Sequence, residues 1–392
     1  MSTDALARRG ITPEDSSTRA GVTGVTGAPG AMGERILDVR DFSVEYGWGE
    51  DAVRAVDHVD VHVERSKVLG IAGESGSGKS TLVYAVTRLL RTPGVITGGE
   101  ARFKLGNSSD GSEEILDLVA ANERELRAVR WSHISVVLQS ALNALNPVVR
   151  VGSQFEQVLK THRRDLSKKE RRDRSEHLLS LVGLDPDRLA RYPHELSGGQ
   201  RQRIMIALSL ALDPQLVIMD EPTTALDVVT QREIIGELYE LRAQFDFAMI
   251  FITHDLSLLV ELADDIVVMY AGRLVERASA FELYEAPRHP YTLGLLNSFP
   301  PMHGNRTELS GIPGSPPDLS DLPSGCNFHP RCPFAMERCS RETPPLTDLG
   351  EAGRSVACWL HSGLDGVHVP VELSRRPPAG RARPVTGREE SS

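Results

Sequence analysis

The sequence predicts an α/β fold built around a parallel sheet. The first observation is VLGIAG at residues 68–73, a short apolar run that leads through a glycine-rich loop into the helical pattern of Ser80–Leu90. The second is a pair of later strand-like runs, QLVIMDEP and FAMIFITHD, which the helix-like QREIIGELYELRAQF separates. Strands that alternate with helices in this way are typical of a parallel sheet covered by helices.

The region before this sheet divides into two parts. Residues 1–33 include GVTGVTGAPGAMG, a stretch rich in Gly, Thr and Ala without periodicity, which predicts a flexible tail. From Arg35 the runs RILDVRDFSVEYG and RAVDHVDVHVE alternate apolar and polar residues, as half-buried antiparallel strands do. We expect these runs to form a small antiparallel β lobe.

Residues 34–285 form the predicted α/β domain, and its part from about 140 to 200 differs from the rest. Helical spacing in VGSQFEQVLKTH and SEHLLSLVGL surrounds the charged run HRRDLSKKERRDR. This pattern predicts a helical insertion. The charged run could attract phosphates or lipid headgroups, but its interleaved opposite charges favour a solvated helix face.

The composition changes again after residue 285. Residues 286–362 are rich in proline and contain all four cysteines, which predicts a small appended domain. Residues 363–392 are rich in Arg, Pro, Gly and Ser and end in REESS, which predicts a disordered tail.

The composition narrows the classes of protein. Of the 392 residues, 40% are hydrophobic and 25% are charged, as in ordinary globular proteins. No apolar run approaches the ~18 residues that span a bilayer. The N-terminus lacks the apolar core of a secretory signal, so we expect the chain in the cytoplasm, attached to a membrane only through partners. A net charge of −10 argues against a nucleic-acid partner.

The glycine-rich loop carries the first chemical signal. It fits G-x-x-x-x-G-K-[ST] between a predicted strand and a predicted helix, as a phosphate-binding loop does. Its backbone N–H groups and the helix N-terminus favour phosphate oxygens, so we expect Lys79 to reach the β- and γ-phosphates and Ser80 to ligate Mg²⁺. A chance glycine-rich turn is the alternative. The expected ATP-binding residues here are Gly73, Glu74, Ser75, Gly76, Ser77, Gly78, Lys79, Ser80 and Thr81.

A pair of carboxylates follows the apolar strand of LVIMDEP. Asp220 suits the magnesium ion, and Glu221 can accept a proton from a water molecule that attacks the γ-phosphate. The alternative is that both are surface acids at a strand end. The phosphate-binding loop upstream favours the catalytic interpretation.

A second candidate anion site precedes the helix-like RQRIMIALSLALD. It consists of Ser197, Gly198, Gly199 and Gln200, and it can bind a γ-phosphate only if that phosphate is presented from outside. This segment resembles the signature motif of ABC transporter ATPases. The resemblance implies a P-loop NTPase cassette with a RecA-like α/β core, an antiparallel β lobe and a helical insertion, which binds ATP in a head-to-tail dimer with a second ATPase subunit.

Further residues match the family in order. The resemblance implies that Gln139 is the Q-loop residue and a magnesium ligand beside Ser80 and Asp220, and that Asp227 lies in the D-loop. It also assigns His254 to the γ-phosphate and Tyr46 to stacking on adenine. A lone histidine at a strand end is more often structural, and a lone tyrosine is more often a core residue.

Several stretches over about residues 35–361 resemble the dipeptide/oligopeptide importer ATPases. They are Leu145–Pro147 with Val151 and Gly152, Ala286–Thr292, and Gly311–Pro317. One departure is Gln139-Ser-Ala, where relatives commonly have Asp-Pro after the Gln.

The resemblance to importer ATPases implies import of peptides at the cytoplasmic face of the membrane. It also implies two permease subunits, a second ATPase subunit that we expect to be a related but different chain, and an extracytoplasmic solute-binding protein. Oligosaccharide or nickel is an alternative cargo. An exporter ATPase, or an ABC protein acting on ribosomes or DNA, is an alternative role.

The four cysteines are spaced C-x5-C-x6-C-x18-C, at Cys326, Cys332, Cys339 and Cys358. Structural disulfides are uncommon in the cytoplasm. Four thiolates can hold a [4Fe–4S] cluster or Zn²⁺, and relatives with this C-terminal pattern are associated with [4Fe–4S]. Reduced structural thiols are the third possibility.

Overall fold

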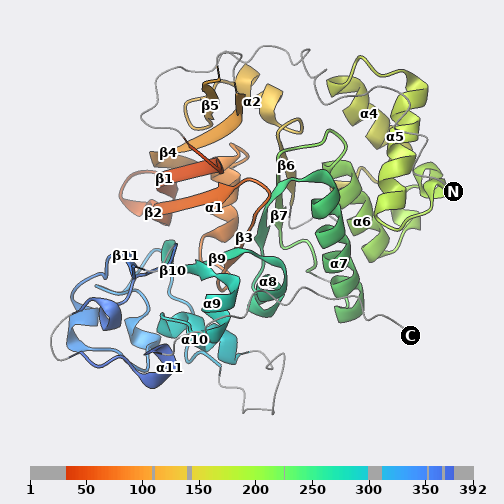
Figure 1. The fold of residues 1–392 in the computed structure, drawn as a ribbon. Helices are drawn as coiled ribbons and strands as arrows, with labels where there is room; N and C mark the ends of the chain where they lie inside the picture. The colour runs from red at the N-terminus through yellow and green to blue at the C-terminus, as the bar shows by residue number, and fades with distance from the viewer. Residues whose placement is uncertain are drawn as a thin grey trace.

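The computed structural model describes residues 32–107, 111–138, 144–224, 226–298, 311–350, 353–363 and 367–374. Figure 1 shows a β lobe above one end of a larger sheet, a helical region beside that sheet, and a C-terminal segment below the lobe. In these ranges no helix is long and apolar enough to cross a membrane. Gln139 lies outside the described residues, as does most of both predicted tails.

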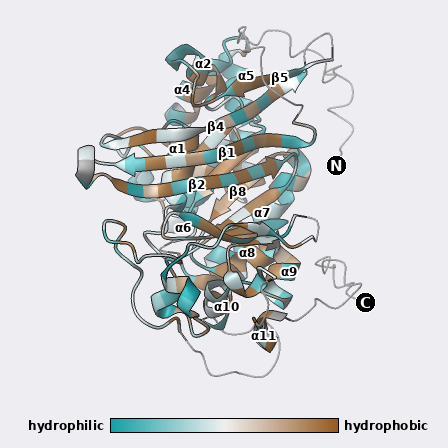
Figure 2. Ribbon diagram, turned by 90° about the vertical axis from the view of Figure 1, so that its left-hand side faces the viewer, coloured by the Kyte–Doolittle hydropathy of each residue, from teal (hydrophilic) through white to brown (hydrophobic). Residues whose placement is uncertain are grey.

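The β lobe is confirmed as an antiparallel sheet with the strand order β2-β1-β4-β5 among the described strands. Figure 2 shows polar and apolar residues alternating along β1 and β2, and the apolar ones pack on α1 and the larger sheet. The strands of the lobe and its helix are β1 (Arg35–Tyr46), β2 (Val53–Glu64), β4 (Gly94–Asn107), β5 (Glu113–Asp117) and α2 (Glu123–Val129), with a 3₁₀ turn at Gly49–Asp51.

The predicted N-terminal tail extends two residues too far. Met32 is buried, and its backbone N–H donates to Glu113 Oε2 at 2.5 Å. Met32 and Gly33 therefore belong to the lobe.

The larger sheet has the order β11-β12-β10-β9-β3-β8-β7-β6 in the described part of the chain. The strands from β9 to β6 are parallel, as predicted, and β3, β7 and β8 are buried along their whole length. The strands are β3 (Val68–Ala72), β6 (Ile134–Val137), β7 (Leu216–Asp220), β8 (Ala248–Ile252), β9 (Asp265–Tyr270), β10 (Arg273–Ser279), β11 (Thr347–Asp348) and β12 (Ser355–Val356).

Helices cover this sheet and form the predicted insertion. α1 (Lys79–Val86) follows the glycine-rich loop. The insertion contains α4 (Val151–His162) and α5 (Lys168–Leu181), with 3₁₀ turns at Pro186–Ala190 and Pro193–Glu195, and α6 (Gly198–Ser209) begins at its end. The remaining helices are α7 (Val228–Phe245), α8 (Leu256–Leu262), α9 (Ala280–Glu285), α10 (Pro290–Asn297) and α11 (Val371–Ser374).

The charged run before and within α5 lies on the outside of the insertion. Ser167 caps α5 through a reciprocal pair of hydrogen bonds with Glu170. Four arginines of the run have carboxylate partners, in the pairs Arg163–Asp165, Arg171–Glu156, Arg172–Glu176 and Arg174–Asp213. This pairing supports the interpretation of the run as a solvated helix face.

The C-terminal segment is not built as an independent unit. β12 pairs with β10, so the segment extends the edge of the larger sheet. Tyr291, Leu295 and Phe328 belong to the same hydrophobic core as the sheet. A short proline-rich segment has too little apolar surface for a core of its own, which explains why it shares that of its neighbour. α11 also packs here, in a stretch predicted to be a disordered tail, where the carbonyl of Leu373 accepts a hydrogen bond from Arg288.

We expect Phe155→Ala to destabilise the protein by about 3–5 kcal/mol, because Phe155 on α4 is fully buried and its loss leaves a cavity in the insertion. Urea unfolding measures the change. Val148→Ala is the matched control, since Val148 is 80% exposed and its truncation should change stability by less than about 0.5 kcal/mol. Equal stabilities of the two variants would contradict the packing argument.

Candidate nucleotide-binding site

The glycine-rich loop is held between two strands at its two ends. A Cβ at Gly73 would lie 2.3 Å from the carbonyl oxygen of Met269 on β9, and one at Gly78 would lie 2.4 Å from that of Ala55 on β2. Both glycines have φ angles in the region that disfavours other residues, +148° and +98°. The loop's curve therefore depends on glycine at both positions.

Lys79 lies inside this curve. Its Nζ donates to the carbonyl oxygens of Gly73 and Glu74, both at 2.8 Å. Burial lowers the pKa of Lys79, and the nearby carboxylates of Glu221, Asp220 and Glu74 oppose that shift. The structure therefore brings the predicted lysine and both predicted carboxylates to one place.

Asp220 ends β7 and has no exposed surface. Ser80 Oγ donates to its Oδ1 at 3.0 Å, and Tyr84 Oη donates to its Oδ2 at 2.6 Å. Burial raises the pKa of Asp220, and the hydrogen bonds from Tyr84 and Ser80 act against that rise. These contacts fix the carboxylate beside the start of α1, where it can share a divalent cation with Ser80.

Tyr84 was missed by the sequence reasoning. It lies four residues after Ser80, so the two side chains lie on one face of α1. That spacing was the available signal.

Glu221 and His254 come from the ends of the neighbouring strands β7 and β8. His254 Nδ1 lies 3.6 Å from Glu221 Oε1, and Thr224 Oγ1 donates to Glu221 Oε2 at 2.9 Å. Glu221 has a φ of +46°, and its N–H donates to the carbonyl oxygen of Ile252. A strained backbone of this kind persists where the surrounding structure imposes it, and such positions cluster at active sites.

The predicted signature residues begin α6. Ser197 and Gln200 cap the helix reciprocally, each side chain binding the other's backbone N–H. A Cβ at Gly199 would lie 2.8 Å from Thr230 Cγ2 on α7, so the start of α6 packs against α7. In Figure 1, α1 and α6 lie on opposite sides of strands β6 and β7. One chain therefore does not bring its phosphate loop and its signature together.

Two other predicted residues lie close to these motifs. Asp227 caps α7, where it accepts a hydrogen bond from the N–H of Thr230 at 2.9 Å, and this bond is the largest cause of its lowered pKa. Tyr46 ends β1, and its hydroxyl lies 3.4 Å from Thr81 Oγ1 on α1. The tyrosine ring is thus next to the helix that follows the phosphate loop.

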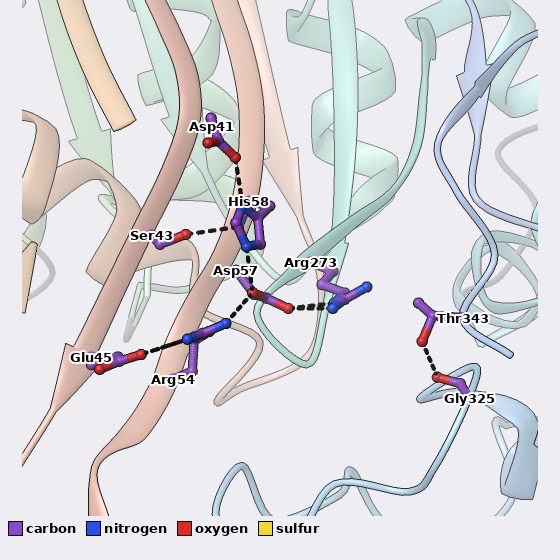
Figure 3. A network of polar contacts seen from close by, with 9 residues as sticks. All are labelled: Asp41, Ser43, Glu45, Arg54, Asp57, His58, Arg273, Gly325 and Thr343. Atoms are coloured by element: carbon purple, nitrogen blue, oxygen red, sulfur yellow. Dashed lines mark hydrogen bonds and ion pairs between the residues drawn. The ribbon is translucent and has the colours of Figure 1, made fainter. Parts of the chain in front are cut away.

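A polar network joins the lobe to β10 close to the loop (Figure 3). Asp57 accepts hydrogen bonds from Arg54 and Arg273, and His58 is bound to Asp41. The N–H of Asp57 donates to the carbonyl of Gly272, whose own N–H donates to that of Ser77 in the loop. The lobe, the β9–β10 turn and the phosphate loop are thus linked through backbone hydrogen bonds.

A cavity of about 340 Å³ lies between this network and the C-terminal segment. Asp57, His58 and Arg273 line one side, and Phe328 and Leu346 are among the residues of the other. No residue of the phosphate loop lines it. The nucleotide site is therefore separate from this cavity.

The four cysteines line one small, mainly apolar cavity together with Phe328, Phe334 and Trp359. Burial raises the pKa of the Cys332 thiol to about 11 and that of Cys358 to about 12. The backbone N–H groups of Phe334 and Leu360 bind those two sulfurs, and the N–H of Met336 lies 3.5 Å from Cys339 Sγ. Within the described ranges, no group of three or more His, Cys, Asp or Glu residues could hold a metal ion as placed.

Comparison with known proteins agrees with this geometry. A family described as "ABC transporter" matches residues 56–224, and one described as "Oligopeptide/dipeptide transporter, C-terminal region" matches residues 275–339. The solved dimeric structure of the ATP-binding cassette MJ0796 bound to ADP and Pi has a TM-score of 0.53 and 26% identity, and it covers 62% of this chain and 98% of that one.

Two curated relatives match this chain over most of its length and most of their own. The dipeptide transport ATP-binding protein DppD of Caldanaerobacter subterraneus is 42% identical over 83% of this chain and 97% of its own. The oligopeptide transport ATP-binding protein OppD of Salmonella typhimurium is 43% identical over 83% and 93%, respectively. The chain is thus an ABC ATPase and belongs to the family of dipeptide and oligopeptide transport ATP-binding proteins.

Proposed function

We propose that this chain hydrolyses ATP to drive the import of dipeptides or oligopeptides, bound to two permease subunits at the cytoplasmic face of the cell membrane. The observation that carries the proposal is the match of residues 275–339 to the C-terminal region of peptide transporters, in a chain that also matches peptide-transport relatives over 83% of its length. A solute-binding protein outside the membrane would supply the peptide. Oligosaccharide and nickel are the competing cargoes.

The phosphate loop, residues 73–80, would bind the phosphates of ATP, with Lys79 exchanging loop carbonyls for phosphate oxygens. Ser80 and Asp220 would hold Mg²⁺ together with Gln139, and the hydrogen bond between Ser80 and Asp220 supports this assignment for those two residues. When bound, the ion neutralises charge on the β- and γ-phosphates. Tyr46 would stack on the adenine, because it lies beside the helix that follows the loop.

Glu221 would take a proton from the attacking water, and His254 would donate a hydrogen bond to the γ-phosphate. Both residues lie at the ends of adjacent strands, and the 3.6 Å between His254 Nδ1 and Glu221 Oε1 supports a joint role. The strained backbone of Glu221 supports a functional reason for its position.

A second ATPase subunit would complete the site, with Ser197, Gly198, Gly199 and Gln200 binding the partner's ATP. The separation of α1 from α6 within one chain supports this arrangement. So do Val228 and Val229, which follow Asp227 and are 68% and 69% exposed, since apolar residues at such a position are suited to an interface. We expect the partner to be a related but different chain.

The cysteines would hold a [4Fe–4S] cluster. The support is that all four line one cavity, that aromatic rings cover it, and that backbone N–H groups face the sulfurs, which are the features that stabilise such clusters. Zn²⁺ held by the same four thiolates, or reduced structural thiols without a metal, are the alternatives.

Cells that lack this chain should lose uptake of labelled di- and oligopeptides, while their uptake of nickel and oligosaccharides stays normal. The wild-type chain should restore peptide uptake, and Glu221→Gln should not, because the amide cannot accept the proton from water. Restored nickel uptake instead of peptide uptake would contradict the proposed cargo.

The effect of the same variant can also be measured as ATP binding and hydrolysis by the assembled transporter. Glu221→Gln should keep ATP binding and lose about 99% or more of turnover, since a general base contributes roughly 10²–10⁴-fold. Lys79→Ala should instead weaken ATP binding itself. Glu240→Gln, on an exposed position of α7, is the matched control, and normal hydrolysis by Glu221→Gln would contradict the base assignment.

Tyr84→Phe should raise the Mg²⁺ concentration needed for half-maximal ATP hydrolysis by about tenfold. The hydroxyl orients Asp220, and removing a group that orients a metal ligand commonly weakens binding by about 10–100-fold. Tyr239→Phe, at an exposed site on α7, controls for loss of a hydroxyl. An unchanged magnesium requirement would show that Tyr84 does not orient the ligand.

Protein purified without oxygen should contain about four iron and four sulfide per chain and absorb broadly in the visible range. The absorbance should vanish when any of the four cysteines is changed to serine, because each supplies one thiolate. One zinc per chain instead would show that the cysteines hold a structural zinc ion. The absence of both iron and zinc would show that they are buried thiols without a metal.

A further inference from the structure

The C-terminal segment reaches the phosphate loop through Arg331. Its Nη1 donates to Glu74 Oε2 at 2.7 Å, and its Nη2 donates to Glu74 Oε1 at 3.0 Å. The two residues are 257 positions apart in the sequence. The Arg331 side chain is 7% exposed and that of Glu74 is 25% exposed, so this two-pronged ion pair is partly shielded from water.

Other contacts hold the Arg331 guanidinium in place. Its Nε donates to the carbonyl of Pro313 at 2.8 Å, and Nη1 also contacts the hydroxyl of Tyr270 on β9. Burial alone would lower the pKa of Arg331, but the hydrogen bonds to Glu74 and Tyr270 outweigh it and raise the pKa. The guanidinium therefore stays charged and oriented toward the loop.

Tyr291 of α10 provides a second contact with the same loop residue. The N–H of Glu74 donates to Tyr291 Oη at 2.7 Å. Tyr291 is fully buried and packs against the rings of Tyr270 and Phe328, with centroids 4.6 and 5.3 Å away. Its hydroxyl therefore has a fixed position.

The carboxylate, the N–H and the carbonyl of Glu74 all have hydrogen-bond partners. Its carboxylate and N–H bind Arg331 and Tyr291, and its carbonyl accepts hydrogen bonds from Lys79 Nζ and the N–H of Ser77. A shift of Glu74 would thus move the carbonyl that orients Lys79. The two C-terminal residues thus bind groups of Glu74 other than the carbonyl that Lys79 contacts.

We propose that Arg331 and Tyr291 are positioning residues of the nucleotide site, which hold Glu74 so that the phosphate loop and Lys79 are preorganised for ATP. Neither residue contacts the reacting atoms. Their loss lets the loop adopt other conformations, and part of the binding energy of ATP is then used to order it. ATP affinity falls, while the turnover of the bound complex changes little.

The test uses the full-length chain with a fluorescent ATP analogue and Mg²⁺, and the assembled transporter for kinetics. Arg331→Ala should weaken binding and raise KM for ATP about tenfold, with kcat within about twofold of the wild type. Arg341→Ala is the matched control, because Arg341 lies in the same segment and pairs only with the exposed Glu337 among the contacts described. Unchanged affinity in Arg331→Ala, with the control also unchanged, would overturn the proposal.

A double-mutant cycle separates this role from a merely structural one. Glu74→Gln removes the negative charge that Arg331 binds. Adding Arg331→Ala to this variant should therefore reduce ATP affinity by clearly less than tenfold. An undiminished tenfold loss in that background would mean that Arg331 does not act through Glu74, and would overturn the proposal. Arg331→Lys should recover part of the affinity.

Tyr291→Phe keeps the proposal testable if Arg331→Ala does not fold. This change removes only the hydroxyl and leaves the buried ring in place. It should raise KM for ATP by about three- to tenfold in a preparation whose thermal unfolding is still cooperative. Wild-type affinity in a folded Tyr291→Phe variant would overturn the role of Tyr291.

Discussion

The close approach of two backbone carbonyls to the glycine-rich loop is the constraint on which the site depends. The carbonyl of Met269 leaves no room for a side chain at Gly73, and that of Ala55 leaves none at Gly78. The first carbonyl belongs to the parallel sheet and the second to the β lobe. The loop is therefore shaped by the packing of two sheets against each other, and its glycines serve close approach as much as backbone freedom.

This constraint explains why distant parts of the chain meet at one place. The lobe contributes Ala55, β9 contributes Met269 and Tyr270, and the C-terminal segment contributes Arg331, which directly precedes Cys332. A change in the turn that contains Cys332 would therefore also move the partner of the loop. The segment that lacks a core of its own is thereby in direct contact with the phosphate loop.

The sequence predicted the local parts of the site better than their long-range supports. The loop with Lys79 and the strand-end carboxylate Asp220 follow from short motifs whose spacing reflects local geometry. Arg331 and Tyr291 could not be inferred, because their roles arise from contacts with Glu74 across more than 200 residues and no local pattern encodes such a pairing.

In the fold as well, local features could be predicted from the sequence and long-range contacts could not. The parallel sheet, the lobe and the helical insertion were predictable, because hydrophobic periodicity reports local secondary structure. The attachment of the C-terminal segment was not, because composition does not reveal that β12 joins the edge of the sheet at β10. Met32 and α11 pack on elements far away in sequence, so the composition around them did not indicate these contacts.

The charged groups of the site are partnered by the chain itself, and this bears on how ATP can bind. Lys79 is bound to neutral carbonyls, and Asp220 to the hydroxyls of Ser80 and Tyr84. Hydrogen bonds between charged groups are stronger than those to neutral ones, so the proposed exchange of a loop carbonyl for a phosphate oxygen would favour binding at Lys79. Lys79 has carbonyl partners in the structure and would have phosphate oxygens as partners after the exchange, which would avoid the large penalty of an unpaired buried ion. A loop preorganised as we propose would let more of that gain appear as affinity, and the contacts on Glu74 would act on its shape.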